Sequence, residues 1–312
     1  MPYDDKTIKL LLKNARYKGE IILNIVSVVL TLGIDALLIY ACYNLQTNPK
    51  LAETVVDFTN INIDFIEFLG EFNSFAIIAL LVIVGGLIVF YNLSYTVKAG
   101  FKNFAVDDLP DEKCIELFDR YCKLLEIKKP ILYLNNITYE SSVFGVKIRG
   151  NKSMGISSKA YHEIMTRQDY HTFDYQVAET LGSIYLHHYD LLFQLATFWA
   201  RIIPIYSKAY SRALSYSTDR IAQILIGTDS LVTSIAREAS GFTFIDDDLS
   251  KELLNPEVLE ITPFQKTAGF LSGIRDVYPL PYFRLTKIYD NDLKDKEFVK
   301  TLNEESNIKP SD

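Results

Sequence analysis

Two long apolar runs dominate the first hundred residues. They cover about 21–45 and about 75–93, and each is long enough to cross the hydrocarbon core of a bilayer as a helix. A buried core helix is the alternative for each run. A cleaved signal peptide is disfavoured, because the first run is long and no small-residue cleavage site follows it. The pattern therefore predicts a transmembrane hairpin within residues 1–98.

From residue 99 the pattern becomes that of a water-soluble domain. Apolar residues at helical spacing predict a helix that starts near Pro110 and stops at Pro130. Short runs at 131–134, 143–148 and 153–157 predict strands, with a turn at 149–152, and a further helix is expected at 175–188. We predict a mainly α protein with a small β-sheet, an α+β fold.

Two later stretches are less regular. Residues 191–206 are apolar but contain Arg201 and Pro204, so we interpret them as a core or membrane-surface helix rather than a third crossing. Residues 293–312 form a charged C-terminal tail that is expected to fray. The predicted divisions are therefore the hairpin at 1–98, a domain at 99–292 and the tail.

Charge sets the expected orientation. Five basic residues precede the first run and Lys98 and Lys102 follow the second, whereas the loop between them carries Lys50 against five acidic residues. The positive-inside rule places both termini and the soluble domain in the cytoplasm, so we expect a multi-pass protein of the cell membrane with lipid as a partner. The net charge of -7 argues against nucleic acid.

Two features of the sequence, its cysteine spacing and an acidic residue in the first apolar run, indicate what chemistry to expect. Cys114 and Cys122 lie eight residues apart, roughly 12 Å along a helix, which is too far for a disulfide and fits a reducing cytoplasm. Asp35 lies within the first apolar run, where an ionised carboxylate is costly. We expect Asp35 to have a function or to pair with a neighbouring helix; protonation or a nearby polar groove is the alternative.

A near-miss motif lies in the predicted helix at 175–188. A membrane zinc peptidase carries H-E-x-x-H there, often as A-H-E-L-G-H-I, and this chain has the stretch Ala178-Glu179-Thr180-Leu181-Gly182-Ser183-Ile184. Three other stretches occur in the matching order, Ser142-Val143-Phe144-Gly145, Ser215-Tyr216-Ser217-Thr218-Asp219 and Tyr278-Pro279-Leu280-Pro281-Tyr282-Phe283-Arg284. The chain resembles the membrane zinc metallopeptidases of the HtpX and CAAX-prenyl-protease type, which implies a zincin-like soluble domain.

The departures from this family decide what activity to expect. H-E-x-x-H places two imidazoles on one helix face to bind zinc, with a glutamate as the base. The resemblance puts Glu179 and Ser183 in the histidine positions, Thr180 in that of the base and Ser215 in that of the third ligand. Serine and threonine hydroxyls are poor zinc ligands and bases at neutral pH. We therefore expect no zinc, no other metal and no catalysis.

The expected function follows from what remains. The family's groove binds an extended peptide at a sheet edge, which needs backbone groups rather than zinc. We predict a catalytically inactive membrane pseudo-peptidase that binds a protein or peptide in a regulatory or scaffolding role. The candidate groove or pocket residues are Ser142, Val143, Phe144, Gly145, Asp219, Tyr278 and Arg284. The alternatives are a hydrolase with an unconventional site, and an interaction or immunity-type protein that uses its membrane hairpin and Asp35.

Overall fold

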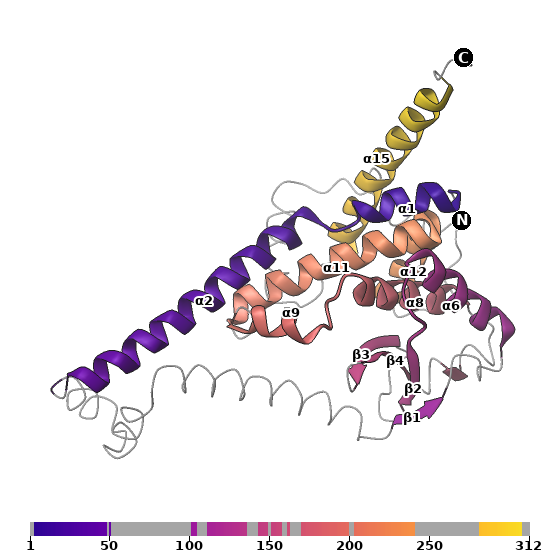
Figure 1. The fold of residues 1–312 in the computed structure, drawn as a ribbon. Coiled ribbons are helices and arrows are strands. Elements are labelled where there is room, and N and C mark those ends of the chain that lie inside the picture. Colours follow the sequence, from indigo (N-terminus) through magenta and orange to yellow (C-terminus); the bar gives the residue numbers. More distant parts are fainter. Residues whose placement is uncertain are drawn as a thin grey trace.

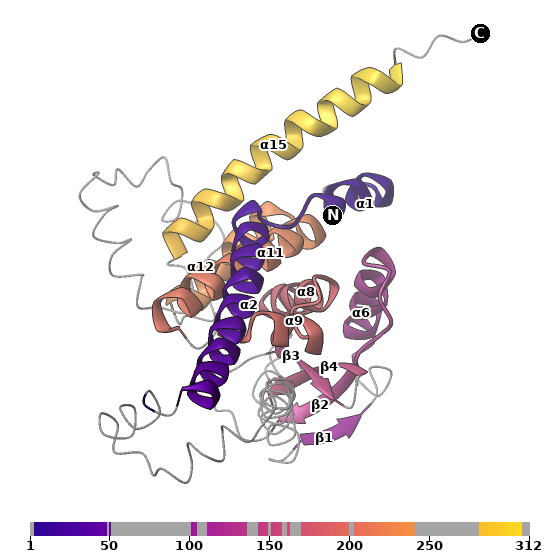
Figure 2. The same cartoon turned by 60° about the vertical axis from the view of Figure 1, so that its left-hand side comes forward.

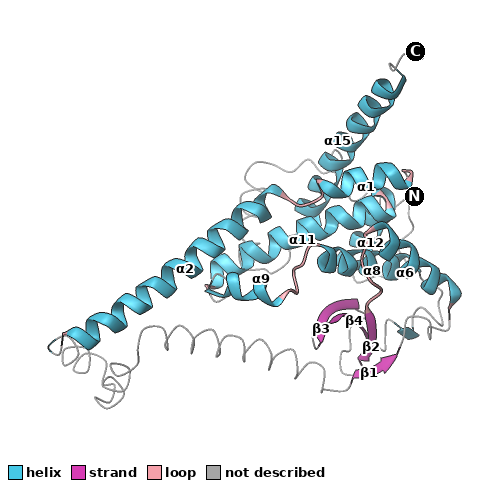
Figure 3. Ribbon diagram, in the orientation of Figure 1, coloured by secondary structure: helices cyan, strands magenta, loops and turns pink. Residues whose placement is uncertain are grey.

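The described part of the chain is mainly helical and contains one small sheet, as predicted (Figure 3). This computed structural model describes residues 3–48, 50, 101–104, 111–135, 143–148, 151–157, 161–162, 170–199, 203–240 and 281–307. The second predicted span at 75–93 lies outside these ranges, as do the candidate positions Ser142 and Tyr278.

Two helices form the N-terminal part. Helix α1 (Asp5–Lys13) begins at Asp4, whose carboxylate accepts the Thr7 backbone N–H, and its apolar face joins the core. Helix α2 (Lys18–Thr47) contains the first predicted span. Among the described residues this N-terminal stretch is the one that is long and apolar enough to cross a membrane, judged by length and composition, and 12% of its most apolar window is buried.

Within the described residues, the sheet has four strands in the order β1-β2-β4-β3. They are β1 (Phe101–Phe104), β2 (Ile131–Asn135), β3 (Val143–Ile148) and β4 (Asn151–Ser157). Strand β4 pairs parallel with β2 and antiparallel with β3, so β3 lies at the edge. Ile148 pairs with Asn151, so two residues separate these strands and the turn predicted at 149–152 is tighter than expected.

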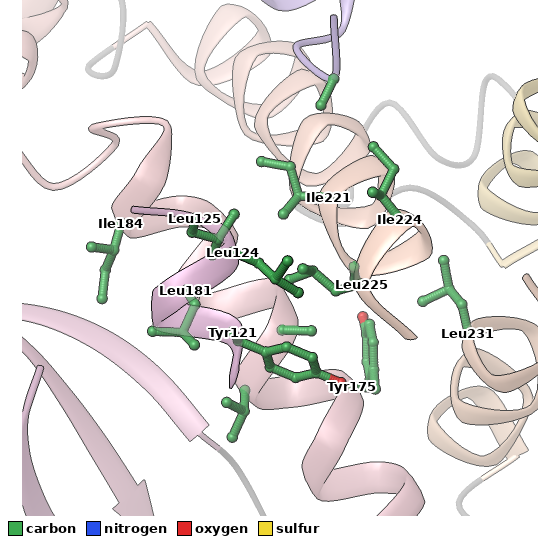
Figure 4. Packing of buried hydrophobic residues seen from close by; sticks show 14 of the residues in the cluster. Tyr121, Leu124, Leu125, Tyr175, Leu181, Ile184, Ile221, Ile224, Leu225 and Leu231 are labelled. Carbon is green, nitrogen blue, oxygen red and sulfur yellow. The ribbon is translucent and has the colours of Figure 1, made fainter. Parts of the chain in front are cut away.

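Helix α8 (Tyr170–Tyr185) lies at the centre of the domain, above the sheet (Figures 1 and 2). It packs against α11 (Pro204–Ile226), α12 (Thr228–Ser240), α6 (Glu112–Leu124) and strand β3. Side chains from α8, α11 and α12 meet in one core, as Figure 4 shows for Leu181, Ile221 and Leu231. Helix α8 ends three residues before the predicted His188, because His187 adopts a positive φ of 64° that stops the helix.

Helix α6 confirms the predicted apolar spacing, but it ends at Leu124 rather than at Pro130, and Glu126 just after it adopts a positive φ of 55°. Asp111 caps its N-terminus by accepting the Lys113 N–H, and both cysteines on the helix are buried and free. Burial raises the pKa of the Cys114 thiol to about 12, with the nearby Asp111 charge as a second cause, and burial also raises that of Cys122 to about 12. Both thiols therefore stay protonated at neutral pH and behave as core residues.

Two expectations about the later chain were wrong. Residues 191–206 are not one helix: α9 (Leu191–Ala196) ends early and α11 begins at Pro204, because proline suits the first turn of a helix but not its interior. The chain does not fray after Asp292, since α15 (Pro281–Asn307) continues to Asn307. Its Asp295 is buried and pairs with both terminal nitrogens of Arg220, which ties the expected tail to the domain.

Candidate functional site

Helices α8 and α11 carry the two stretches that resemble zinc-binding segments, and they lie unusually close together at Gly182. A Cβ atom on Gly182 would stand 3.1 Å from Cγ2 of Ile221, which is tighter than normal packing. Packing alone therefore explains why glycine occupies position 182, without any role for zinc. It lets the backbone of α8 approach the buried Ile221 of α11.

This close packing places Glu179 of α8 against α11. The Thr218 hydroxyl lies 3.4 Å from Oε1 of Glu179 and 3.0 Å from the Ser215 carbonyl oxygen. The Ser215 hydroxyl donates to the carbonyl of Ser211 at 3.2 Å. Thr180 is buried and Ser183 is half-buried on the same helix as Glu179. Glu179 thus faces the Ser215–Asp219 stretch, as the resemblance implies, and its contact there is a hydroxyl.

The donor set does not suit zinc. The residues in the former ligand positions are two serines and one glutamate, and zinc in proteins is bound mainly by thiolate, imidazole and carboxylate groups. Within the described ranges no three His, Cys, Asp or Glu side chains are grouped so that they could bind a metal ion. The arrangement offers one carboxylate and several hydroxyls, which can form hydrogen bonds.

A buried ion pair joins two of the candidate groove residues. Arg284 of α15 donates from Nε to Oδ2 of Asp219 at 2.9 Å and from Nη2 to Oδ1 at 2.7 Å. Nη2 also donates to the hydroxyl of Tyr175 on α8. Burial alone would lower the pKa of Arg284, but the charge of Asp219 outweighs it and raises that pKa well above the usual value. The residues assigned to a groove thus connect three helices in the domain interior.

Val143, Phe144 and Gly145 lie elsewhere, on strand β3. This strand packs against α8, the helix that carries Glu179. The structure therefore places the sequence-predicted site residues in two neighbouring groups, one on the edge strand and one between α8, α11 and α15.

A second polar cluster was not predicted. Glu20, at the start of α2, is fully buried, and its Oε1 lies 3.2 Å from Nε2 of His188 and 3.2 Å from Nε of Arg16. The Tyr17 N–H donates to the Ser217 hydroxyl at 2.9 Å beside it. The sequence signal was an acidic residue directly before an apolar run. His188 is buried and belongs to this cluster through its contact with Glu20.

Asp35 has a partner within the chain. Its Oδ1 accepts the indole N–H of Trp199 at 2.8 Å, and Trp199 follows α9. Asp35 therefore contacts the stretch of chain between α9 and α11.

A cavity of about 360 Å³ lies where α2 begins. Its lining includes Tyr216 of the second motif, whose ring lies 5.3 Å from that of Tyr17; burial is the main cause that raises the pKa of Tyr216 to about 12. The charged residues in its wall are Arg16, Lys18, Arg220, Lys287, Asp290 and Lys294. The wall is therefore mainly basic and adjoins the apolar part of α2.

Comparison of the chain with protein-family models, with curated proteins and with solved structures gave no match. The resemblance to zinc metallopeptidases consequently stays an expectation from sequence.

The close approach at Gly182 gives a stability test. In the interior of a solvent-exposed helix, replacing glycine with alanine raises the free energy of unfolding by about 1 kcal/mol. Here we expect a loss of about 1–2 kcal/mol in the free energy of unfolding, because the new methyl group crowds Ile221. Urea unfolding in detergent, followed by circular dichroism, measures the difference.

Gly33 of α2 is the matched control, since a Cβ there meets no atom within 4 Å. Gly33→Ala should leave the free energy of unfolding unchanged or raise it slightly. Equal behaviour of the two alanine variants would contradict the tight α8–α11 contact.

Proposed function

We propose that this protein is a membrane-anchored, catalytically inactive peptidase-like protein that binds an extended peptide segment of a partner. Helix α2 supplies the anchor and the domain built around α8 supplies the binding surface. The observation that carries the proposal is the position of β3, an edge strand that packs against α8.

Strand addition explains how such an edge binds a peptide. In the described part of the chain β3 has β4 as its strand neighbour, on one side. The backbone N–H and C=O groups on the other side of an edge strand can pair with an added chain. Val143, Phe144 and Gly145 lie on this strand, so the backbone there would form the ladder with the peptide.

The absence of catalysis follows from residue chemistry. Neither serine nor threonine at the former ligand and base positions can supply an imidazole or a general base near neutral pH. The Ser215 and Thr218 hydroxyls also form hydrogen bonds within α11. In this proposal the protein retains a zincin-like arrangement as a scaffold. It needs no cofactor to bind a peptide.

The proposed location is a cell membrane, with the described domain on the cytoplasmic side. Basic residues at the start of α2, Arg16 and Lys18, support this orientation, because such residues favour the cytoplasmic face. A second crossing at 75–93 belongs to the proposal as well. The alternative in which Asp35 recognises a partner has less support, because its carboxylate already accepts the Trp199 indole.

Peptide capture tests this function. Random decapeptides displayed on phage are panned on the full-length protein in detergent, and enriched peptides are synthesised. Proline is then placed at Val146 and, separately, at Lys147. Because alternate amides of an edge strand point toward or away from its neighbour, one of these variants removes an outward donor and keeps the β3–β4 ladder. We expect that variant to bind about tenfold more weakly.

Two results would count against the proposal. One is the absence of enriched peptides; the other is equal binding by the unmodified protein and by both proline variants, with an intact hairpin shown by hydrogen exchange. Mass spectrometry of the bound peptide should find it uncut, and cleavage that depends on added zinc would contradict the inactive assignment.

A further inference from the structure

Helix α2 carries a stripe of polar residues within its apolar sequence. Their spacing of four, three, four and four places them on one helix face, and they are Glu20, Asn24, Ser27, Thr31 and Asp35. Away from this stripe many side chains are apolar and exposed, including Ile22, Val29 and Leu37. A helix surrounded by lipid would be apolar all round, so the stripe indicates that one face contacts protein.

Four of the five stripe residues contact side chains between residues 188 and 210, whereas the buried Thr31 hydroxyl has no hydrogen-bond partner among the described residues. Glu20 contacts His188 at 3.2 Å, and Asn24 accepts from the Tyr210 hydroxyl at 2.6 Å.

Ser27 lies 3.0 Å from the Tyr206 hydroxyl, and Asp35 accepts from Trp199 at 2.8 Å. The chain therefore runs along α2 from Glu20 toward Asp35 and then returns, and Figure 1 shows α9 and α11 beside α2.

These contacts fix how deep the segment would lie. Asp35 follows Glu20 by fifteen residues, which is about 22 Å along a helix axis. The hydrocarbon core of a bilayer is about 30 Å thick. If the apolar run of α2 enters the bilayer after Glu20, then Trp199 lies well inside it.

The outer surface of the returning segment suits acyl chains. Leu192 on α9 is 81% exposed and Ile205 on α11 is 72% exposed, and Ile203 between them is also exposed. This apolar surface is continuous with the exposed face of α2, since both helices pack on α2. The Thr197 hydroxyl donates to the Phe193 carbonyl at the end of α9, which satisfies a polar group at a helix end.

We propose that residues 189–199 and 203–210 belong to a re-entrant segment that enters the bilayer from the cytoplasmic side and returns, with its polar side on the stripe of α2 and Leu192 and Ile205 among acyl chains. The proposal rests on the membrane span of the proposed function. It gives Asp35 and Glu20 a definite role, which is to position this segment against α2.

Trp199 is the single tryptophan of the chain and so reports on its own depth. The full-length protein is reconstituted into phosphatidylcholine vesicles that contain lipids brominated at the 6,7 or 11,12 acyl positions. We expect brominated lipid to reduce the Trp199 emission roughly twofold, since bromine then lies at the depth of the indole. Iodide in the aqueous phase should have little effect.

The matched control moves the tryptophan out of the segment. The variant Trp199→Phe with Phe298→Trp places it on the partly exposed outer part of α15. Its emission should be quenched by iodide and not by brominated lipid. The same pattern for Trp199 in the unmodified protein would overturn the re-entrant segment.

Alkaline carbonate extraction separates the two proposals. If the protein resists extraction but iodide quenches Trp199, the α2 span is supported and the re-entrant segment is contradicted. A protein that carbonate releases from the vesicles overturns both.

Discussion

Replacing Asp219 with alanine is expected to lower the free energy of unfolding by about 3–5 kcal/mol, because it leaves the Arg284 guanidinium buried without its carboxylate partner. The change also removes one contact between α11 and α15, while the Arg220–Asp295 pair between the same helices remains. Urea unfolding of the detergent-solubilised protein, followed by circular dichroism, measures the loss.

A double variant shows whether the loss comes from the unpaired charge. Asp219→Leu combined with Arg284→Met removes both charges at once, and we expect it to recover most of the stability, since apolar residues can replace a buried pair with little cost. Equal losses in the single and double variants would contradict the ion pair as the source of stability. The double variant also remains informative if Asp219→Ala does not fold.

Introducing the zinc ligands that the resemblance implies should give a variant that binds about one zinc ion per chain. The variant carries Glu179→His, Thr180→Glu, Ser183→His and Ser215→Glu. The contact of Thr218 with Glu179 supports the register, since it puts these turns of α11 and α8 beside each other. Metal analysis after dialysis, together with zinc titration, measures the gain.

A variant that carries the first three changes but keeps Ser215 is the matched control. It lacks the third ligand and should bind zinc more weakly. A folded quadruple variant that binds no zinc would show that the resemblance to zinc metallopeptidases does not extend to the geometry of α8 and α11.

The local elements followed from the sequence because local patterns decide them. The apolar spacing in α6, its Asp111 cap and the length of the apolar run in α2 all act within a few turns of one helix. The strand predictions at 131–134 and 143–148 also agree with β2 and β3. The failures came where distant residues decide the outcome: α15 continues past Asp292 because Arg220 pairs with Asp295, 75 residues away.

The candidate site was predicted in part. Sequence letters alone show that Glu179, Ser183 and Ser215 cannot form a zinc site with histidine ligands. The Ser215–Asp219 stretch does lie against α8, as the resemblance implied. The bond between Asp219 and Arg284 was not predicted, because nothing local to either residue identifies a partner 65 positions away.

The sequence by itself determined an apolar run near the N-terminus and a helical domain with a small sheet, because both depend on composition and on periodicity within one segment. The positions compared with a zinc site rest on the resemblance alone. Only the tertiary structure decided that β3 is an edge strand against α8, that Arg284 pairs with Asp219, and that the polar stripe of α2 faces residues 188–210. These contacts join distant segments, and the packing of the whole chain selects them because buried polar groups must find partners there.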